Sequence, residues 1–212
     1  MTTVLLTGFE PFGGDASNPS GDAVRLVAAA WTGPETLVTA VLPVTFDGAA
    51  EQLAELIEAH SPDVVIATGL AGGRAALSVE RIAVNLVDAR IPDNDGAQPV
   101  DQPSIEGRPT AHLTSLPAKA IVRDLAARGI PSELSHSAGT FVCNHAFYAA
   151  TDAAARRGGM RAGFIHVPWD DGRGPAGSPS LPLEDIAAGL SIAVRTTLDT
   201  PADIAARGGA LH

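Results

Sequence analysis

Short apolar runs alternate with longer amphipathic stretches along most of this chain. Apolar runs bounded by turn-forming residues are typical of buried strands, whereas apolar residues three and four positions apart are typical of helices. The predicted strands are Thr3–Thr7, Thr36–Leu42, Val64–Thr68, Arg81–Val87 and Ala162–Val167. The predicted helices are Asn18–Trp31, Phe46–His60, Ala118–Arg128, Asn144–Arg157 and Leu183–Leu198. This alternation predicts an α/β fold, in which helices cover both faces of a mostly parallel twisted sheet.

Two segments, Asp88–Pro109 and Trp169–Pro182, have no periodic pattern and are rich in Pro, Gly and Asp. Loops of this length in a compact domain are more often functional than incidental, although a mobile surface excursion is the alternative. Ligands of open α/β sheets bind beyond the carboxyl ends of the strands. We therefore look for the chemistry at strand ends and in these loops.

Composition narrows the classes of function. The chain has 212 residues, 45% of them hydrophobic, which suits one well-buried core, so we expect a single domain over residues 1–212. Its formal net charge is −10, and its thirteen arginines and one lysine are scattered, which argues against a nucleic-acid partner. No apolar run approaches the roughly 20 residues that cross a bilayer, and the first residues carry no cationic region. We expect a cytoplasmic protein with no membrane partner.

Cys143 is the only cysteine, and it follows a glycine turn at the start of an alanine-rich helical stretch. The free N–H groups and positive dipole of a helix N-terminus favour a thiolate, so this position predicts a pKa lowered from about 8.5 towards neutrality. Such a thiol is a nucleophile. The alternative is that Cys143 is a small buried hydrophobic residue.

A cysteine nucleophile needs a base, and the base must be oriented by a third group. His166 falls at the end of an apolar strand that stops at Pro168, although it can equally be a core histidine. His145 is two residues beyond Cys143, and this helical offset turns its side chain to the opposite face, which predicts a structural or solvent-facing role. The remaining histidines are His60 and His212, at an element end and the chain terminus, and His112 and His136, in or beside loops.

Glu80 is a carboxylate at the entry to another predicted strand. By itself it is a weak signal, because an acid beside an arginine, here Arg81, is usually a surface ion pair.

Together these segments resemble the pyroglutamyl peptidase I family, intracellular cysteine peptidases that remove an N-terminal pyroglutamate from peptides. The matching segments are Leu6–Gly14 with Asn18–Ser20, Glu80–Asn85, Asp88–Asn94, and those around Cys143 and His166. The resemblance implies that Cys143 is the nucleophile, that His166 is the general base and acid, and that Glu80 orients the imidazole. It also implies a homotetramer.

The resemblance further implies a pocket for the lactam ring, lined or supported by Phe9, Phe12, Asn18, Ile91, Phe141 and Val142. A neutral lactam calls for apolar walls with a few donors and acceptors. Candidate oxyanion donors are the backbone N–H of Cys143 and the side chain of Arg90, which can instead pair with Asp88 or Asp93. The mechanism needs no metal and no cofactor.

The chain departs from the family pattern at Leu70, where several members carry a glutamine, and near His112, where some read Ala-Tyr-Phe. These changes bear on affinity and substrate preference. Two other functions remain open: a nucleoside-phosphorylase-like enzyme on a similar sheet, and a non-catalytic small-molecule binding protein that uses Cys143 for packing.

Overall fold

The computed structural model describes residues 1–209 and alternates strands with helices over most of that length. In chain order the elements are β1 (Thr3–Phe9), α1 (Pro19–Ala30), β2 (Thr36–Leu42), α2 (Phe46–His60), β3 (Val64–Leu70), β4 (Leu77–Glu80), β5 (Ile82–Val84), β6 (Ala111–Leu113), α3 (Ala118–Ala127), β7 (Ser132–Ser135), α4 (Val142–Arg157), β8 (Arg161–Val167), β9 (Trp169–Asp170), β10 (Ser180–Leu181) and α5 (Leu183–Asp199). The five predicted helices and four of the five predicted strands are confirmed, with ends that differ by up to two residues.

The central sheet has the strand order β2-β1-β3-β8-β4-β7. Strands β2, β1, β3 and β8 are parallel to one another, β4 is antiparallel to β8, and β7 is parallel to β4. The expectation of a mostly parallel sheet is therefore confirmed. In the single antiparallel step, Glu80 at the end of β4 pairs with Phe164, and Ser78 pairs with His166 near the end of β8.

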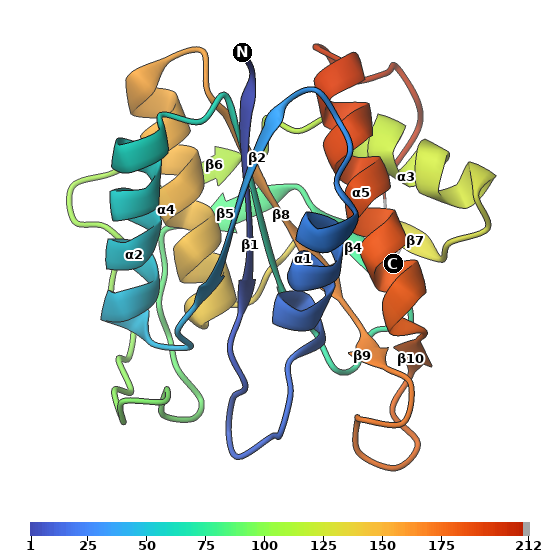
Figure 1. Cartoon of the computed structure of the whole chain (residues 1–212). Helices are drawn as coiled ribbons and strands as arrows, with labels where there is room; N and C mark the ends of the chain where they lie inside the picture. The colour runs from blue at the N-terminus through green and yellow to red at the C-terminus, as the bar shows by residue number, and fades with distance from the viewer. Residues whose placement is uncertain (210–212) are drawn as a thin grey trace.

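Helices form one layer on each face of the sheet (Figure 1). Helices α2 and α4 cover one face, and α1, α3 and α5 cover the other. Strand side chains alternate between these two layers. In β1, Leu5 packs in the cluster under α2 and α4, whereas Val4 and Leu6 pack in the cluster under α1 and α5. Each of these three side chains is fully buried, so the two faces have separate hydrophobic cores.

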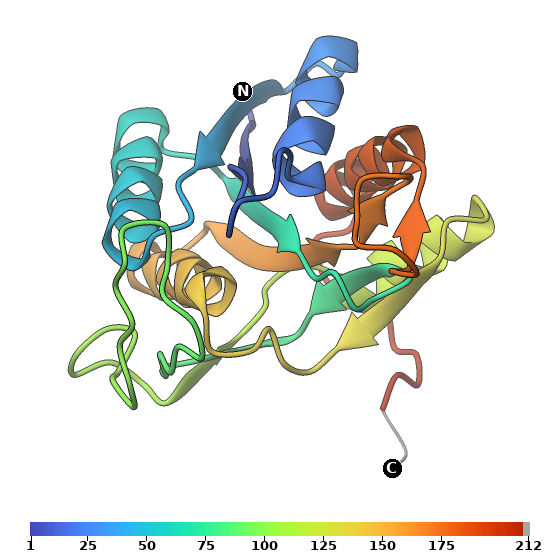
Figure 2. The same ribbon diagram turned by 90° about the horizontal axis from the view of Figure 1, so that it is seen from below.

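Strands β1, β3 and β8 have their carboxyl ends at the lower edge of the molecule in Figure 1, and Figure 2 views the molecule from that side. Helix α4 begins at the same edge, and the long loop after β1 lies beside it. This is the edge at which α/β sheets bind their ligands.

Of the predicted strand Arg81–Val87, only Ile82–Val84 form a strand, β5, and it lies outside the central sheet. The strand of the central sheet is β4, which ends at Glu80, and β5 leaves that sheet to pair with β6. The sequence pattern missed β4 because its residues alternate: Leu77 and Val79 are apolar, but Ser78 between them and Glu80 after them are polar, so no apolar run marks the strand. Glu80 is therefore the last residue of β4, and it lies two residues before β5 begins.

The two segments without periodicity contain little regular structure. The first holds one isolated bridge between Val87 and Gln102, and the second holds the two-residue strands β9 and β10. Among residues 1–209, every helix is too short or too polar to reach across a bilayer.

Candidate active site

Cys143 is the second residue of α4, at the edge of the sheet where the ligand is expected. The turn before the helix depends on Gly139, whose φ of +77° is accessible to glycine at no steric cost. The hydrogen bond that closes the first helical turn runs from His145 N–H to the carbonyl of Phe141, at 3.1 Å. The backbone N–H of Cys143 therefore lies in the first turn, where a helix offers no acceptor of its own.

The thiol of Cys143 lies directly over Gly69 in β3. A Cβ atom built on Gly69 would stand 2.7 Å from the Cys143 sulfur and 2.9 Å from the ring of Phe164, closer than real Cβ atoms approach other atoms. Gly69 is paired with His166 across the β3–β8 ladder. Because paired residues of a parallel ladder face the same side of the sheet, the absent side chain at position 69 leaves the thiol room beside the histidine strand.

Glu80 and His166 form a buried pair. The Nδ1 atom of His166 is 2.7 Å from Oε1 of Glu80, and the two residues are 4% and 0% exposed. The carboxylate accepts the proton of Nδ1, which leaves the lone pair of Nε2 as the free position of the neutral ring. Among the hydrogen bonds within residues 1–209, none joins this ring to the sulfur of Cys143.

A third group, Arg74, contacts the same carboxylate. Its Nη1 atom is 2.7 Å from Oε1 of Glu80, and its Nη2 atom donates to the carbonyl of Ser137 at 3.1 Å. Sequence reasoning missed Arg74, because the expected neighbour of Glu80 was Arg81, which lies against His136 instead. The interpretation of Glu80 as half of a surface ion pair is wrong, since the residue is fully buried.

The charge states of the three groups follow from burial and from each other. Burial raises the pKa of the Cys143 thiol to about 12, with a further rise from the charge of Glu80 and a lowering by Arg74. Burial also lowers the pKa of His166, and this outweighs the opposing effect of Glu80. For Glu80, burial acts to raise the pKa, but His166, Ser135 and Arg74 together bring it below its usual value.

The resting site therefore holds a neutral thiol, a neutral imidazole and a carboxylate. The expectation that the helix N-terminus lowers the pKa of Cys143 towards neutrality is wrong here, because burial and the charge of Glu80 raise that pKa by more than Arg74 lowers it.

A cavity of about 180 Å³ opens beside the thiol. Its lining residues are Phe9, Phe12, Asp15, Ser17, Asn18, Val44, Leu70, Phe141, Val142 and Cys143. The aromatic rings pack against one another. The ring centroids of Phe12 and Phe141 are 5.4 Å apart, and the ring of Phe46 packs edge-on against Phe141 with a centroid distance of 5.2 Å. A cavity of this size and lining suits one small, mostly apolar ring.

Asn18 lines the cavity but directs its polar atoms into the protein. Its Nδ2 donates to the carbonyl of Glu10 at 2.8 Å, and its Oδ1 accepts from the N–H and hydroxyl of Ser20. Ser20 in turn accepts the N–H of Phe9. Asn18 thus fixes the loop that carries Phe9.

Two other candidate residues lie apart from this lining. Ile91 is 44% exposed, and Arg90 is exposed on the same loop. Hydrogen bonds between Asp88 and Thr140 in both directions tie that loop to the segment that precedes Cys143. The carboxylate of Asp93 accepts hydrogen bonds from backbone N–H groups, including that of Phe46 at 2.9 Å.

The other histidines have structural surroundings. His145 contacts the hydroxyl of Ser104 at 2.7 Å through Nδ1 and packs on Phe46, so the expected structural role fits and a solvent-facing one does not. His112 stacks on Tyr148, and His136 contacts Arg81. His60 is exposed at the end of α2, and His212 lies outside the described residues.

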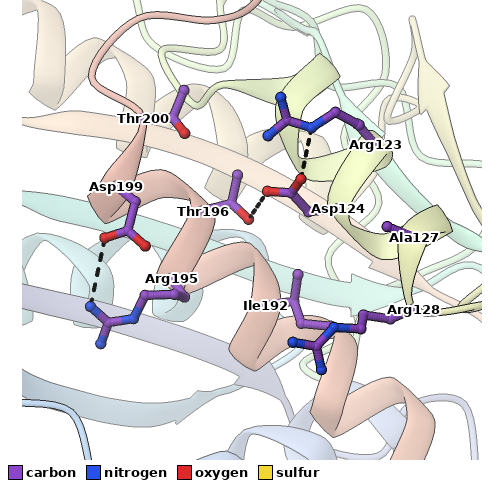
Figure 3. Close-up of a pocket in the computed structure, with 9 residues that line it drawn as sticks. All are labelled: Arg123, Asp124, Ala127, Arg128, Ile192, Arg195, Thr196, Asp199 and Thr200. Carbon is purple, nitrogen blue, oxygen red and sulfur yellow. Dashed lines mark hydrogen bonds and ion pairs between the residues drawn. The ribbon is translucent and has the colours of Figure 1, made fainter.

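A second hollow, of about 380 Å³, lies between α3 and α5 (Figure 3). Its charged groups are mostly paired. Arg123 pairs with Asp124, which also accepts the hydroxyl of Thr196, and Arg195 pairs with Asp199 and with Glu35, which lies outside the hollow. None of the candidate catalytic residues lines it. Within residues 1–209 no cluster of three histidine, cysteine or acidic side chains is arranged to hold a metal ion.

Comparison with known proteins gives one consistent result. The family model described as pyroglutamyl peptidase matches residues 2–200. The pyrrolidone-carboxylate peptidase of Cupriavidus taiwanensis is 48% identical over the full length of both chains, and that of Clavibacter michiganensis is 43% identical over the full length of both.

Solved structures agree with the sequence relatives. A crystal structure of Bacillus amyloliquefaciens pyroglutamyl peptidase I superposes with a TM-score of 0.92 at 44% identity, covering 96% of this chain and 100% of that one. The pyrrolidone carboxyl peptidase of Thermococcus litoralis superposes with a TM-score of 0.89 at 40% identity, covering 94% of each chain.

Proposed function

Because the chain belongs to the pyroglutamyl peptidase family, we propose that Cys143, His166 and Glu80 form its catalytic triad. The protein is a cysteine-type hydrolase that removes N-terminal pyroglutamate from peptides. The observation that supports the triad most strongly is the 2.7 Å contact between Glu80 and His166. His166 lies on β8, which pairs with β3, and the thiol of Cys143 lies over Gly69 of β3.

In the first half of the reaction, the sulfur of Cys143 attacks the carbonyl carbon of the pyroglutamyl residue. Nε2 of His166 takes the thiol proton as the carbon–sulfur bond forms, since the resting thiol is neutral. Glu80 holds the ring through Nδ1–H and stabilises the imidazolium. The imidazolium then gives its proton to the amine of the departing peptide, the carbon–nitrogen bond breaks, and a thioester remains.

In the second half, water attacks the thioester and His166 accepts a proton from it. The carbon–sulfur bond breaks, the proton returns to sulfur, and pyroglutamic acid leaves. The developing oxyanion needs donors, of which the backbone N–H of Cys143 is one candidate. Arg90 is a second candidate; its loop is tied to Thr140, but Arg90 itself is exposed.

The lactam ring is proposed to occupy the cavity lined by Phe9, Phe12, Asn18, Phe141 and Val142, with Ile91 at the loop beyond it. An apolar cavity favours the uncharged lactam over proline, whose charged amine would lose its hydration against these rings. Leu70 adds an apolar wall and no hydrogen bond.

The test compares a fluorogenic pyroglutamyl amide with its prolyl analogue. We expect the pyroglutamyl amide to be hydrolysed and the prolyl amide to be cleaved at least about a hundredfold more slowly. Comparable turnover of the two would overturn the assignment of the cavity even if Cys143 proved catalytic. A phosphorylase would in addition require phosphate, and a binding protein would hydrolyse neither compound.

We also propose a homotetramer in the cytoplasm, acting on peptides without a nucleic-acid or membrane partner. The family resemblance supports the tetramer, and a catalytic thiol that must stay reduced suits a reducing compartment. Light scattering after gel filtration tests the first, and cell fractionation tests the second.

A further inference from the structure

The carboxylate of Glu80 serves two donors through one oxygen. Oε1 lies 2.7 Å from Nδ1 of His166 and 2.7 Å from Nη1 of Arg74. The other oxygen, Oε2, has no hydrogen-bond partner among the described residues. A fully buried carboxylate with so few partners is costly unless a cation compensates its charge, and the cation in contact here is Arg74.

Arg74 is held from both sides of the site. Its loop is anchored to the end of the histidine strand, because the N–H of Ala71 donates to the carbonyl of Val167 at 2.9 Å. Gly72 packs on Trp169 so closely that a Cβ atom there would stand 2.5 Å from the indole nitrogen. On the other side, Nη2 of Arg74 donates a hydrogen bond to the carbonyl of Ser137, in the turn that leads to Cys143.

We propose that Arg74 is a positioning residue of this site, which fixes the Glu80 carboxylate in the orientation that receives Nδ1–H of His166. The inference rests on the proposed triad. It adds a fourth member that touches neither substrate nor reacting atoms, and that joins the carboxylate to the segments carrying the histidine and the cysteine.

The charge of Arg74 gives this role a signature that a purely structural tether lacks. Arg74 lowers the pKa of Glu80, of His166 and of Cys143. The base is active when neutral, so activity is lost as pH falls through the pKa of His166. Loss of Arg74 raises that pKa, and the acid limb of kcat/KM therefore moves to higher pH.

The experiment measures kcat/KM against pH for hydrolysis of the pyroglutamyl amide, whose lactam does not titrate in this range. For Arg74→Gln we expect a loss of about tenfold to a hundredfold, typical of a charged hydrogen bond, and an acid limb at least about half a pH unit higher. Arg74→Lys keeps the charge and should keep the limb in place, while still losing rate because lysine cannot bridge Glu80 and Ser137.

The matched control is Arg81→Gln, which removes the same charge one residue after Glu80 but from a side chain that faces His136. Arg81→Gln should change neither kcat/KM nor the pH of its acid limb. In a Glu80→Gln background, Arg74→Gln should cause little further loss, because the two residues act as a unit.

A rate loss in Arg74→Gln with an unchanged limb, or no loss at all, would overturn the proposal and leave the triad intact. Failure of the triad would show differently, as full activity in Cys143→Ser. If Arg74→Gln does not fold, Arg74→Met keeps the aliphatic stem and the same two readouts.

Discussion

The two faces of the central sheet are built from the same strands but have different tasks. Towards α1, α3 and α5, the strands present large apolar side chains, such as Ile66 in β3, Val79 in β4 and Val167 in β8. Towards α4, the last positions of the same strands are Gly69, Glu80 and His166. One face is packed throughout, and the other gives up packing at its carboxyl edge.

This difference implies that stability and catalysis can be damaged separately. Substitutions on the packed face remove buried area far from the thiol, whereas substitutions at the edge of the α4 face disturb a few contacts around one sulfur. Each prediction below acts on one of the two faces and has its own control.

The largest effect is expected from Cys143→Ser. The hydroxyl keeps the shape but has a far higher pKa than the thiol, and His166 cannot deprotonate it effectively. Pyroglutamyl amide hydrolysis should fall by at least about a thousandfold, with the midpoint of thermal unfolding nearly unchanged. A variant that kept wild-type turnover would show that Cys143 serves packing alone. Thiol titration gives a clean control, because the wild type has one cysteine per chain.

On the packed face, Ile66→Ala should cost about 2–5 kcal/mol of unfolding free energy, as expected for truncating a fully buried aliphatic residue. Its kcat/KM at temperatures well below the transition should match the wild type, since its side chain points away from the thiol. Urea unfolding and steady-state kinetics on one preparation measure both. A large kinetic loss without a stability loss would contradict the separation of the faces.

Gly69→Ala places a methyl group against the sulfur and the Phe164 ring, and should displace the thiol. A displacement of roughly 1 Å can cost about a hundredfold in rate, and we expect a loss of that order in kcat/KM. The matched control is Gly73→Ala in the loop that follows β3, where a Cβ atom meets nothing within 4 Å. Equal activities of the two variants would show that the approach of the thiol over β3 does not matter.

Most elements could be predicted from pattern on both faces of the sheet. Strands β1, β3 and β8 lie in apolar runs, and the five helices have apolar residues at helical spacing. Strand β4 escaped detection because Ser78 and Glu80 on its polar side interrupt the run. At Glu80 the group proposed for the chemistry breaks the apolar pattern, whereas His166 lies near the end of a run that still reveals its strand.

Within the site, the residues that sequence reasoning singled out carry recognisable functional groups, such as the thiol of Cys143 and the ring of His166. Gly69 and Arg74 carry no such mark, since one acts through an absent side chain and the other through a contact between separate loops. The pKa of Cys143 also depended on burial and on Glu80, which local sequence does not show.

The smallest effect concerns pH and stability. Burial lowers the pKa of both His166 and His145, which lie on the α4 face. For each, the unfolded chain binds a proton below about pH 6.5 that the folded protein does not, so unfolding free energy falls as pH drops through that value. The slope contributed by each histidine is at most about 1.4 kcal/mol per pH unit.

His145→Gln should flatten this dependence and leave the acid limb of kcat/KM in place, while His60→Gln, at an exposed helix end, should change neither. Urea titrations between pH 7.5 and 5.5 measure this dependence. If the unfolding free energy of His145→Gln depended on pH as strongly as that of the wild type, the burial of His145 would not be a cause of the dependence.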